Sequence, residues 1–449
     1  MSQASGSHRE IRKLIRAFVI ATDSFNKELG DDAPQASAVY HFPPVFEHPD
    51  GSCIHIGDKA EQILTQAVEE SLTFLQLTST VTYGDFNALF RTYLSKYLSE
   101  YSNSKIDMKV FLDELVEAVK RGSSDLKVLV PFIGSPLQET EQSIDIGSVR
   151  VFSKDILERE YTERVRLAER DGDELAINGE EASAHYENFN WFIEVPISGV
   201  YSARLTEEHA LNIATLVMNL FHLCYGADNT RDLEVTFNLP VYKDTRMLAM
   251  RADGSVETRS TMTWGSLTGL QGGFLKGFEK FYGEQLSVYA EVVALQLEHQ
   301  KIYPFNQRFV DSLYWYGDAI REESPTVAIV KFITSLERLF TFDENEEISK
   351  SLRERAIVFL YHTGFISDCN VDTFTRAIKD AYDARSKVVH GVLSPTESLK
   401  KALLMNISLI CKKTLLAYAS YMSKHLNHSG KEDFLKEHLK DLVSRYKFA

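Results

Sequence analysis

The spacing of apolar residues along the chain changes near position 304. Downstream of that point, apolar residues recur every three or four positions, which is typical of helices with one buried face. Ser324-Pro325 supplies an N-cap before an N1 proline, and Gly391 suits the position just past a helix end. The predicted helices are 306–322, 325–342, 347–363, 371–389, 396–425 and 431–446. Residues 304–449 are therefore predicted to form an all-α bundle.

The first 303 residues show both helical and strand-like patterns. Helices are predicted at 9–30, 58–79, 83–102, 106–120, about 205–225 and about 275–300. Short apolar runs predict strands in KVLVPFIG, SIDIGSVRVF, NFNWFIEVPISGVY and LEVTFNLPVY, and Asp253-Gly254 suggests the turn of a further hairpin. The predicted fold class is thus multidomain. An α+β region at 1–303, divisible into a helical 9–120 and a sheet-containing 126–300, precedes the all-α bundle.

Three helices of the predicted bundle carry a charge on their apolar stripe. Arg385 interrupts the stripe of 371–389, Glu337 that of 325–342, and Arg355 that of 347–363. A charge facing a core is costly unless it is paired, so we expect these groups to meet. An ion pair that only fixes helix register is favoured for Glu337 and Arg355. A functional role is favoured for Arg385, which Glu337 would then orient.

The functional role of Arg385 is favoured because His390 lies five residues further along the chain. Arg385 and His390 form an Arg-x4-His pair, in which a permanent charge and a group that titrates near neutrality suit phosphodiester chemistry. On a continuing helix five residues advance about 500°, so the two side chains would lie about 140° apart. Either the helix breaks at Gly391 and re-aims the histidine, or a second copy of the chain completes the site. The two apolar sides of 396–425 favour the second alternative.

Composition and charge limit the possible partners. The net charge of −15 argues against nucleic-acid binding by the whole surface, yet residues 385–449 hold 12 Lys+Arg against 5 Asp+Glu. That segment could attract an RNA backbone, or it could simply be a solvated helix face. No apolar stretch of about 18 residues and no secretory signal are evident, which predicts a cytoplasmic protein without a membrane span. No cofactor and no metal site are expected.

Three segments of the bundle resemble the HEPN superfamily, and most closely the ApeA-like HEPN domains of prokaryotic antiviral defence. They are FITSLERLF (332–340), ISKSLRERAIVFL (348–360) and IKDAYDARSKVVHG (378–391). The order of these segments and the RSKVVHG ending are more specific than the bare Arg-x4-His motif. The likeness covers about 306–425. The first 303 residues are similar only to the variable sensor or regulatory region that such proteins often carry.

The resemblance implies a metal-independent endoribonuclease that acts as a homodimer in abortive infection. Arg385 and His390 would be the catalytic pair, with Glu337, Tyr382 and Arg355 in support. Ser386 stands where many family members have a larger polar residue. A ribose 2′-OH would attack the adjacent phosphorus to give a 2′,3′-cyclic phosphate, which requires RNA rather than DNA. A phage-derived or cellular trigger would act on the N-terminal region. The alternative is a non-catalytic helical module that binds RNA or a partner protein.

Overall fold

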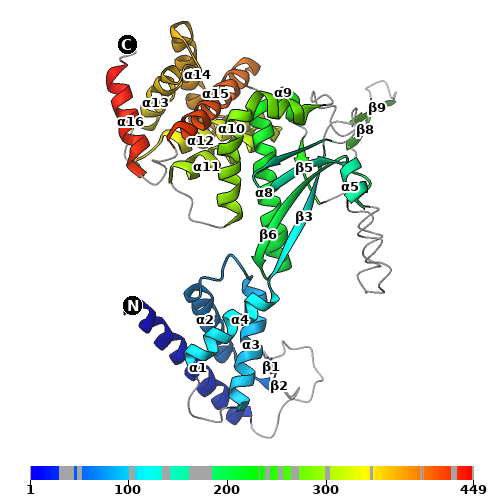
Figure 1. The fold of residues 1–449 in the computed structure, drawn as a ribbon, viewed down its shortest axis with the longest axis vertical. Helices are drawn as coiled ribbons and strands as arrows, with labels where there is room; N and C mark the ends of the chain where they lie inside the picture. The colour runs from blue at the N-terminus through cyan, green and yellow to red at the C-terminus, as the bar shows by residue number, and fades with distance from the viewer. Residues whose placement is uncertain are drawn as a thin grey trace. The chain divides into compact units, whose positions relative to one another are not determined.

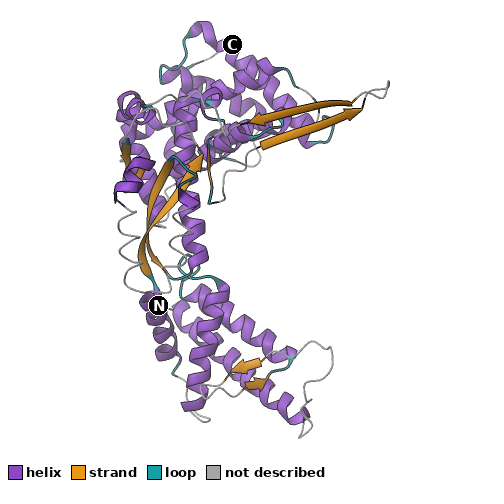
Figure 2. Ribbon diagram, turned by 90° about the vertical axis from the view of Figure 1, so that its right-hand side faces the viewer, coloured by secondary structure: helices purple, strands orange, loops and turns teal. Residues whose placement is uncertain are grey.

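The chain folds into two compact units, one formed by Met1–Leu126 with Ile197–His209 and the other by Lys127–Pro196 with Ala210–Ala449. The structure is a computed structural model in which helices predominate (Figure 1, Figure 2). It describes residues 2–29, 45–47, 53–100, 107–133, 142–160, 185–231, 233–237, 243–250, 256–263, 273–298, 304–343, 347–394, 397, 399–425 and 432–446.

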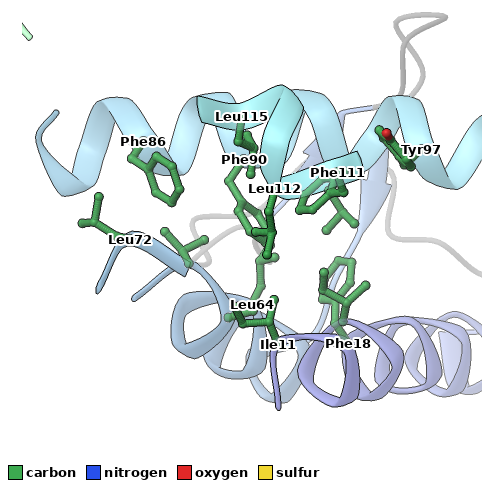
Figure 3. Close-up of a cluster of buried hydrophobic side chains, with 14 of the residues drawn as sticks. Ile11, Phe18, Leu64, Leu72, Phe86, Phe90, Tyr97, Phe111, Leu112 and Leu115 are labelled. Carbon is green, nitrogen blue, oxygen red and sulfur yellow. The ribbon is translucent and has the colours of Figure 1, made fainter. Parts of the chain in front are cut away.

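In the first unit, four helices that lie wholly within its described residues surround an apolar core. They are α1 (Ser2–Leu29), α2 (Asp58–Phe74), α3 (Tyr83–Glu100) and α4 (Met108–Gly122), with a short antiparallel pair of strands, β1 (Val45–Glu47) and β2 (Cys53–His55). Each helix turns an apolar stripe inward, and Figure 3 shows side chains from all four helices meeting in one cluster. Phe90 and Phe111 pack edge to face at its centre, with ring centroids 5.2 Å apart.

Most of a small sheet of five described strands, in the order β4-β5-β6-β3-β7, belongs to the second unit. The strands of this sheet are β3 (Ser124–Ile133), β4 (Ser143–Ile146), β5 (Val149–Ser153), β6 (Trp191–Val200) and β7 (Glu234–Val235). The β4–β5, β5–β6 and β3–β7 pairs are antiparallel. Trp191 anchors the sheet to a helix, because its ring stacks on Phe132 and meets Phe274 edge to face at 4.8 Å. The strands predicted in KVLVPFIG, SIDIGSVRVF and NFNWFIEVPISGVY are therefore confirmed, whereas in LEVTFNLPVY the strand is limited to Glu234–Val235 and residues 238–242 lie outside the described residues.

Further elements complete the region before the bundle. They are α5 (Lys154–Glu160), α8 (Ala203–Tyr225), α9 (Ala227–Thr230), α10 (Phe274–Leu297) and a hairpin of β8 (Lys243–Met250) with β9 (Val256–Thr263). The predicted hairpin is confirmed in its strands, although its turn residues Asp253-Gly254 lie outside the described residues. The predicted boundary at 303–304 falls inside the second unit. There, Tyr289 of α10 stacks on Phe309 of the following helix at 6.4 Å.

Among the residues that the structure describes, six helices form the predicted bundle at the C-terminal end of the chain (Figure 1). They are α11 (Pro304–Arg321), α12 (Pro325–Phe340), α13 (Ile348–His362), α14 (Asp368–Val389), α15 (Lys401–His425) and α16 (Glu432–Arg445). Helix α12 lies against α11, α13, α14 and α15. Buried hydroxyls fix its register on α11, because Ser312 Oγ and Ser335 Oγ each donate to the other residue's carbonyl, at 2.7 and 2.8 Å.

Close packing also ties α8 to α11 through a glycine. A Cβ added at Gly317 would lie 1.9 Å from Oδ1 of the fully buried Asn219. That oxygen accepts a hydrogen bond of 2.8 Å from Arg321 Nη1, so it cannot retreat without breaking the bond. Position 317 therefore requires glycine because of space rather than backbone conformation.

Helix α15 departs from two predictions. It begins at Lys401 rather than at 396, and the carbonyl of Lys400 accepts from the amide of Leu403 at 2.9 Å. It is also long and apolar enough to cross a membrane by length and composition alone. Lys412 and Lys413 interrupt its apolar run in the sequence. In the structure Ile407, Cys411, Leu415 and Tyr418 are fully buried, so α15 packs as a core helix.

Candidate active site at the end of helix α14

The end of α14 is fixed by its backbone. Gly391 has a φ of +72°, its amide donates to Val388 O at 3.1 Å, and the Val392 amide donates to Lys387 O at 2.8 Å. This pair of bonds is a Schellman motif, which satisfies the last carbonyls of a helix and favours glycine at the left-handed position. The prediction that Gly391 ends the helix is confirmed.

His390 is the C-cap residue of this motif. Its φ and ψ are −87° and 7°, and its amide still donates to Ser386 O at 3.0 Å, so the helical path continues up to it. The break therefore follows His390, and the backbone does not re-aim its side chain towards Arg385. The two residues remain about 140° apart around the helix axis, with Ser386 between them. The His390 side chain is exposed.

Arg385 lies on the buried stripe of α14 and meets Glu337 of α12. Its Nη2 lies 3.5 Å from Glu337 Oε2, and the two side chains are 26% and 15% exposed. Arg385 Nε and Glu337 Oε1 are both buried without a hydrogen-bond partner in the part of the chain that the structure describes. The predicted meeting of these two groups is thus observed, with hydrogen-bonding capacity left unused on both sides.

Tyr382 completes this cluster one turn before Arg385. The Arg385 guanidinium carbon lies 5.7 Å from the centre of the Tyr382 ring, within the range of a cation–π contact. Burial raises the pKa of Glu337, and the nearby Arg385 opposes that shift. Burial and the charge of Glu337 also raise the pKa of Tyr382, so its hydroxyl keeps its proton at neutral pH. Arg385 thus contacts both a carboxylate and an aromatic ring.

Arg355 has a different position from the one that the stripe pattern suggests. Its Nη1 donates to Phe340 O, the last residue of α12, at 2.6 Å. Its guanidinium carbon lies 5.2 Å from the Phe342 ring, and that of Arg308 lies 4.4 Å from the same ring. Cations at the C-terminal end of a helix donate hydrogen bonds to its last carbonyls and interact favourably with the negative end of the helix dipole. Arg355 therefore stabilises the end of α12, while Glu337 pairs with Arg385.

Sequence reasoning missed a polar groove beside this cluster. It contains Arg308, Asp311 and Arg338, and Arg338 pairs with Asp311 through Nε and Nη2. The residue adjacent to Glu337 in the sequence is Arg338, but nothing local indicates that Asp311 lies opposite it. That pairing depends on the alignment of α11 on α12.

Histidines gather at a second place in the bundle, where α13, α15 and α16 meet. The His438 ring centroid lies 5.5 Å from that of His362, 6.3 Å from that of His425 and 5.4 Å from that of Tyr421. Burial, reinforced by the two other histidines, lowers the pKa of His438. Among the described residues, no three His, Cys, Asp or Glu side chains are grouped so as to hold a metal ion.

The geometry therefore provides an exposed histidine and a restrained, partly buried arginine on one helix. An arginine can stabilise charge on a phosphoryl group, and a histidine can exchange a proton near neutral pH. Comparison with protein-family models, curated proteins and solved structures finds no match, so the geometry stands alone in describing this site.

Proposed function

We propose that the chain is a metal-independent endoribonuclease of the HEPN type, which acts in the cytoplasm in anti-phage defence by abortive infection. The observation that carries the proposal is that Glu337 and Tyr382 restrain Arg385 on α14, the helix that ends at the exposed His390. The resemblance of the three bundle segments to ApeA-like HEPN domains supports the same reading.

In this reaction the ribose 2′-oxygen forms a bond to the adjacent phosphorus, and the bond from phosphorus to the 5′-oxygen breaks. The products are a 2′,3′-cyclic phosphate and a 5′-OH. His390 accepts the 2′-OH proton or supplies a proton to the leaving 5′-oxygen, a role worth about 10²–10⁴-fold in rate. Arg385 stabilises the negative charge that develops on the phosphoryl oxygens. Ser386, between the two residues on the helix, would be a supporting contact to the same phosphate.

A homodimer accounts for the angle between Arg385 and His390. Val389 and Val392, on either side of the His390-Gly391 pair, are 53% and 74% exposed. On α15, Met405 and Leu409 lie one turn apart and are 55% and 45% exposed. Exposed apolar residues of this kind are suited to contact a second copy. We propose that Arg385 of one copy and His390 of the other act on the same phosphodiester.

The test is RNA cleavage by the purified protein, with Arg385→Ala and His390→Ala compared with the natural chain. Arg376→Ala is the matched control for the arginine, because Arg376 is an exposed residue of the same helix. His362→Ala is the control for the histidine, because His362 is exposed at the end of α13. We expect both site variants to lose cleavage and both controls to keep it. Folded site variants that cleave normally would refute the proposal.

Mixing the two inactive variants tests the shared site. A dimer of one Arg385→Ala copy and one His390→Ala copy contains one intact Arg385–His390 combination across the interface. We expect the mixture to regain part of the activity. A mixture that stays inactive, although mixed dimers form, argues that both residues must come from one chain.

A second candidate function is a non-catalytic helical module that binds RNA or a partner protein. The wide separation of Arg385 and His390 around α14 favours it, because one chain does not bring them together. In either case we propose that the N-terminal region responds to a phage-derived or cellular trigger. This candidate would be supported if the natural chain binds RNA without cleaving it and if the Arg385→Ala and His390→Ala variants bind RNA with the same affinity.

A further inference from the structure

A groove of about 390 Å³ lies between α11 and α12, directly beside the Arg385–Glu337 pair. Glu337 lines this groove and also contacts Arg385, so one carboxylate connects the two places. The other lining residues are Pro304, Gln307, Arg308, Asp311, Thr334, Arg338 and Thr341. A ligand in the groove would therefore lie next to the phosphodiester on which Arg385 acts.

Arg338 is the accessible cation of the groove. Its side chain is 53% exposed, and Asp311 Oδ2 accepts from both Nε, at 3.1 Å, and Nη2. Gln307 Nε2 donates to the other oxygen of Asp311 at 2.6 Å, which holds the carboxylate in place. Within the described residues Arg338 Nη1 has no partner, so the restrained guanidinium keeps free donors. Arg308 instead forms the wall of the groove, since its Nη1 donates to Arg338 O and Thr341 O.

The charges of the groove distinguish between parts of an RNA strand. Two arginines and two carboxylates line it, so its side chains offer both donors and acceptors. A phosphate presents only acceptors and a negative charge, which Asp311 and Glu337 would repel. A nucleobase edge is neutral and presents donors and acceptors together. Guanine matches this set best, because O6 and N7 accept from an arginine while N1 and N2 donate to a carboxylate.

We infer that this groove binds a nucleobase of the RNA beside the cleaved bond, with a preference for guanine set by Arg338 and Asp311. The inference rests on the proposed function for its substrate class, and it adds a determinant of sequence preference to that function. Recognition of an unpaired base by its hydrogen-bonding edge is the usual way in which proteins read single-stranded RNA.

The experiment measures binding of labelled uridine octamers by fluorescence anisotropy, with one central position changed to guanine, adenine or cytosine. The full-length His390→Ala protein is used so that cleavage does not interfere. The variants Arg338→Gln and Asp311→Asn are added to this background. Arg204→Gln is the matched control, because Arg204 is likewise an exposed arginine paired with a carboxylate, Glu208, in the other unit.

We expect the guanine octamer to bind about ten-fold more tightly than the others, since one good arginine–base pair discriminates to that order. Arg338→Gln and Asp311→Asn should each remove the preference, and Arg204→Gln should keep it. A phosphate site gives another result, which would overturn the inference. In that case Arg338→Gln weakens every octamer equally and lowers the salt dependence by about one counterion, while Asp311→Asn tightens every octamer.

The failure of this inference can be separated from failure of the proposed function. RNA cleavage with an unchanged nucleotide preference in Arg338→Gln would overturn the inference and leave the nuclease intact. Guanine-dependent binding that requires Arg338, in a protein that never cleaves RNA, would support the groove and refute the nuclease. Equal binding of all four octamers by the protein with an intact groove would overturn the inference directly.

Discussion

The Schellman motif after α14 gives a prediction that separates the position of His390 from the stability of the bundle. Gly391 and Gly364 follow α14 and α13 in the same conformation, with φ of +72° and +77°. Each lies in the same two-bond motif, and no atom lies within 4 Å of a Cβ added at either position. Alanine at either site therefore meets a conformational cost and no steric clash.

The magnitude follows from the backbone alone. A left-handed conformation costs a residue other than glycine about 1–2 kcal/mol. Alanine also reduces the entropy of the unfolded chain, which offsets about 0.4–1 kcal/mol of that cost. We expect Gly391→Ala and Gly364→Ala each to lower the free energy of unfolding by about 1 kcal/mol, as measured by urea denaturation.

Their effects on activity should differ. Gly391 follows the proposed catalytic histidine directly, whereas Gly364 follows the α13 C-cap, Thr363. A displacement of about 1 Å at a reacting group can reduce a rate about 100-fold. We therefore expect Gly391→Ala to reduce RNA cleavage at least about ten-fold, and Gly364→Ala to leave it near that of the natural chain. Equal losses of activity in the two variants would show that stability alone is responsible. No loss of stability in either variant would show that the left-handed conformation costs alanine nothing at these two positions.

Three further predictions concern packing and charge in the second unit. Gly317→Ala places a methyl group against the buried Asn219 and should destabilise the protein by about 2–3 kcal/mol in urea denaturation, more than either left-handed glycine. Arg355→Met removes the bond to Phe340 O and should cost about 1–2 kcal/mol, with RNA cleavage retained if Arg355 only stabilises α12. Burial lowers the pKa of His438 from 6.5 in the folded state. The contribution of neutral His438 to the free energy of unfolding is therefore complete above about pH 6.5 and is lost as the pH falls through the folded-state pKa. His438→Phe should flatten the pH dependence of the melting temperature below about pH 6.5, and an unchanged profile would contradict this.

Local sequence signals predicted the helices of the bundle well, because each helix has one apolar stripe and its ends carry their own signals. Ser324 accepts from the Val327 amide at 3.4 Å as an N-cap, and Gly391 adopts the left-handed turn expected of it. The pairing of Arg385 with Glu337 could also be predicted from the sequence, since a charge on a buried stripe requires a partner.

Other features depend on contacts that no local pattern encodes. Arg355 was expected near the same carboxylate, but α12 ends at Phe340 and brings an unsatisfied carbonyl within its reach. The pairing of Arg338 with Asp311 depends on the alignment of two helices that buried serines set. The predicted change from a helical 9–120 to a sheet-containing 126–300 lies close to the unit boundary after Leu126, but the grouping of residues 197–209 with the first unit depends on contacts that are distant in sequence.

The position of Glu337 has a consequence in terms of thermodynamic linkage. The same carboxylate belongs to the groove and to the Arg385 pair, so a ligand that changes the charge or placement of Glu337 also changes the restraint on Arg385. By reciprocity, any change at Arg385 that favours one arrangement of Glu337 must alter the affinity of the groove by the same factor. Binding of a base in the groove and binding of the phosphodiester by Arg385 would then be coupled through the position of Glu337. Substrates with the wrong base would be disfavoured at the reacting centre as well as in the groove.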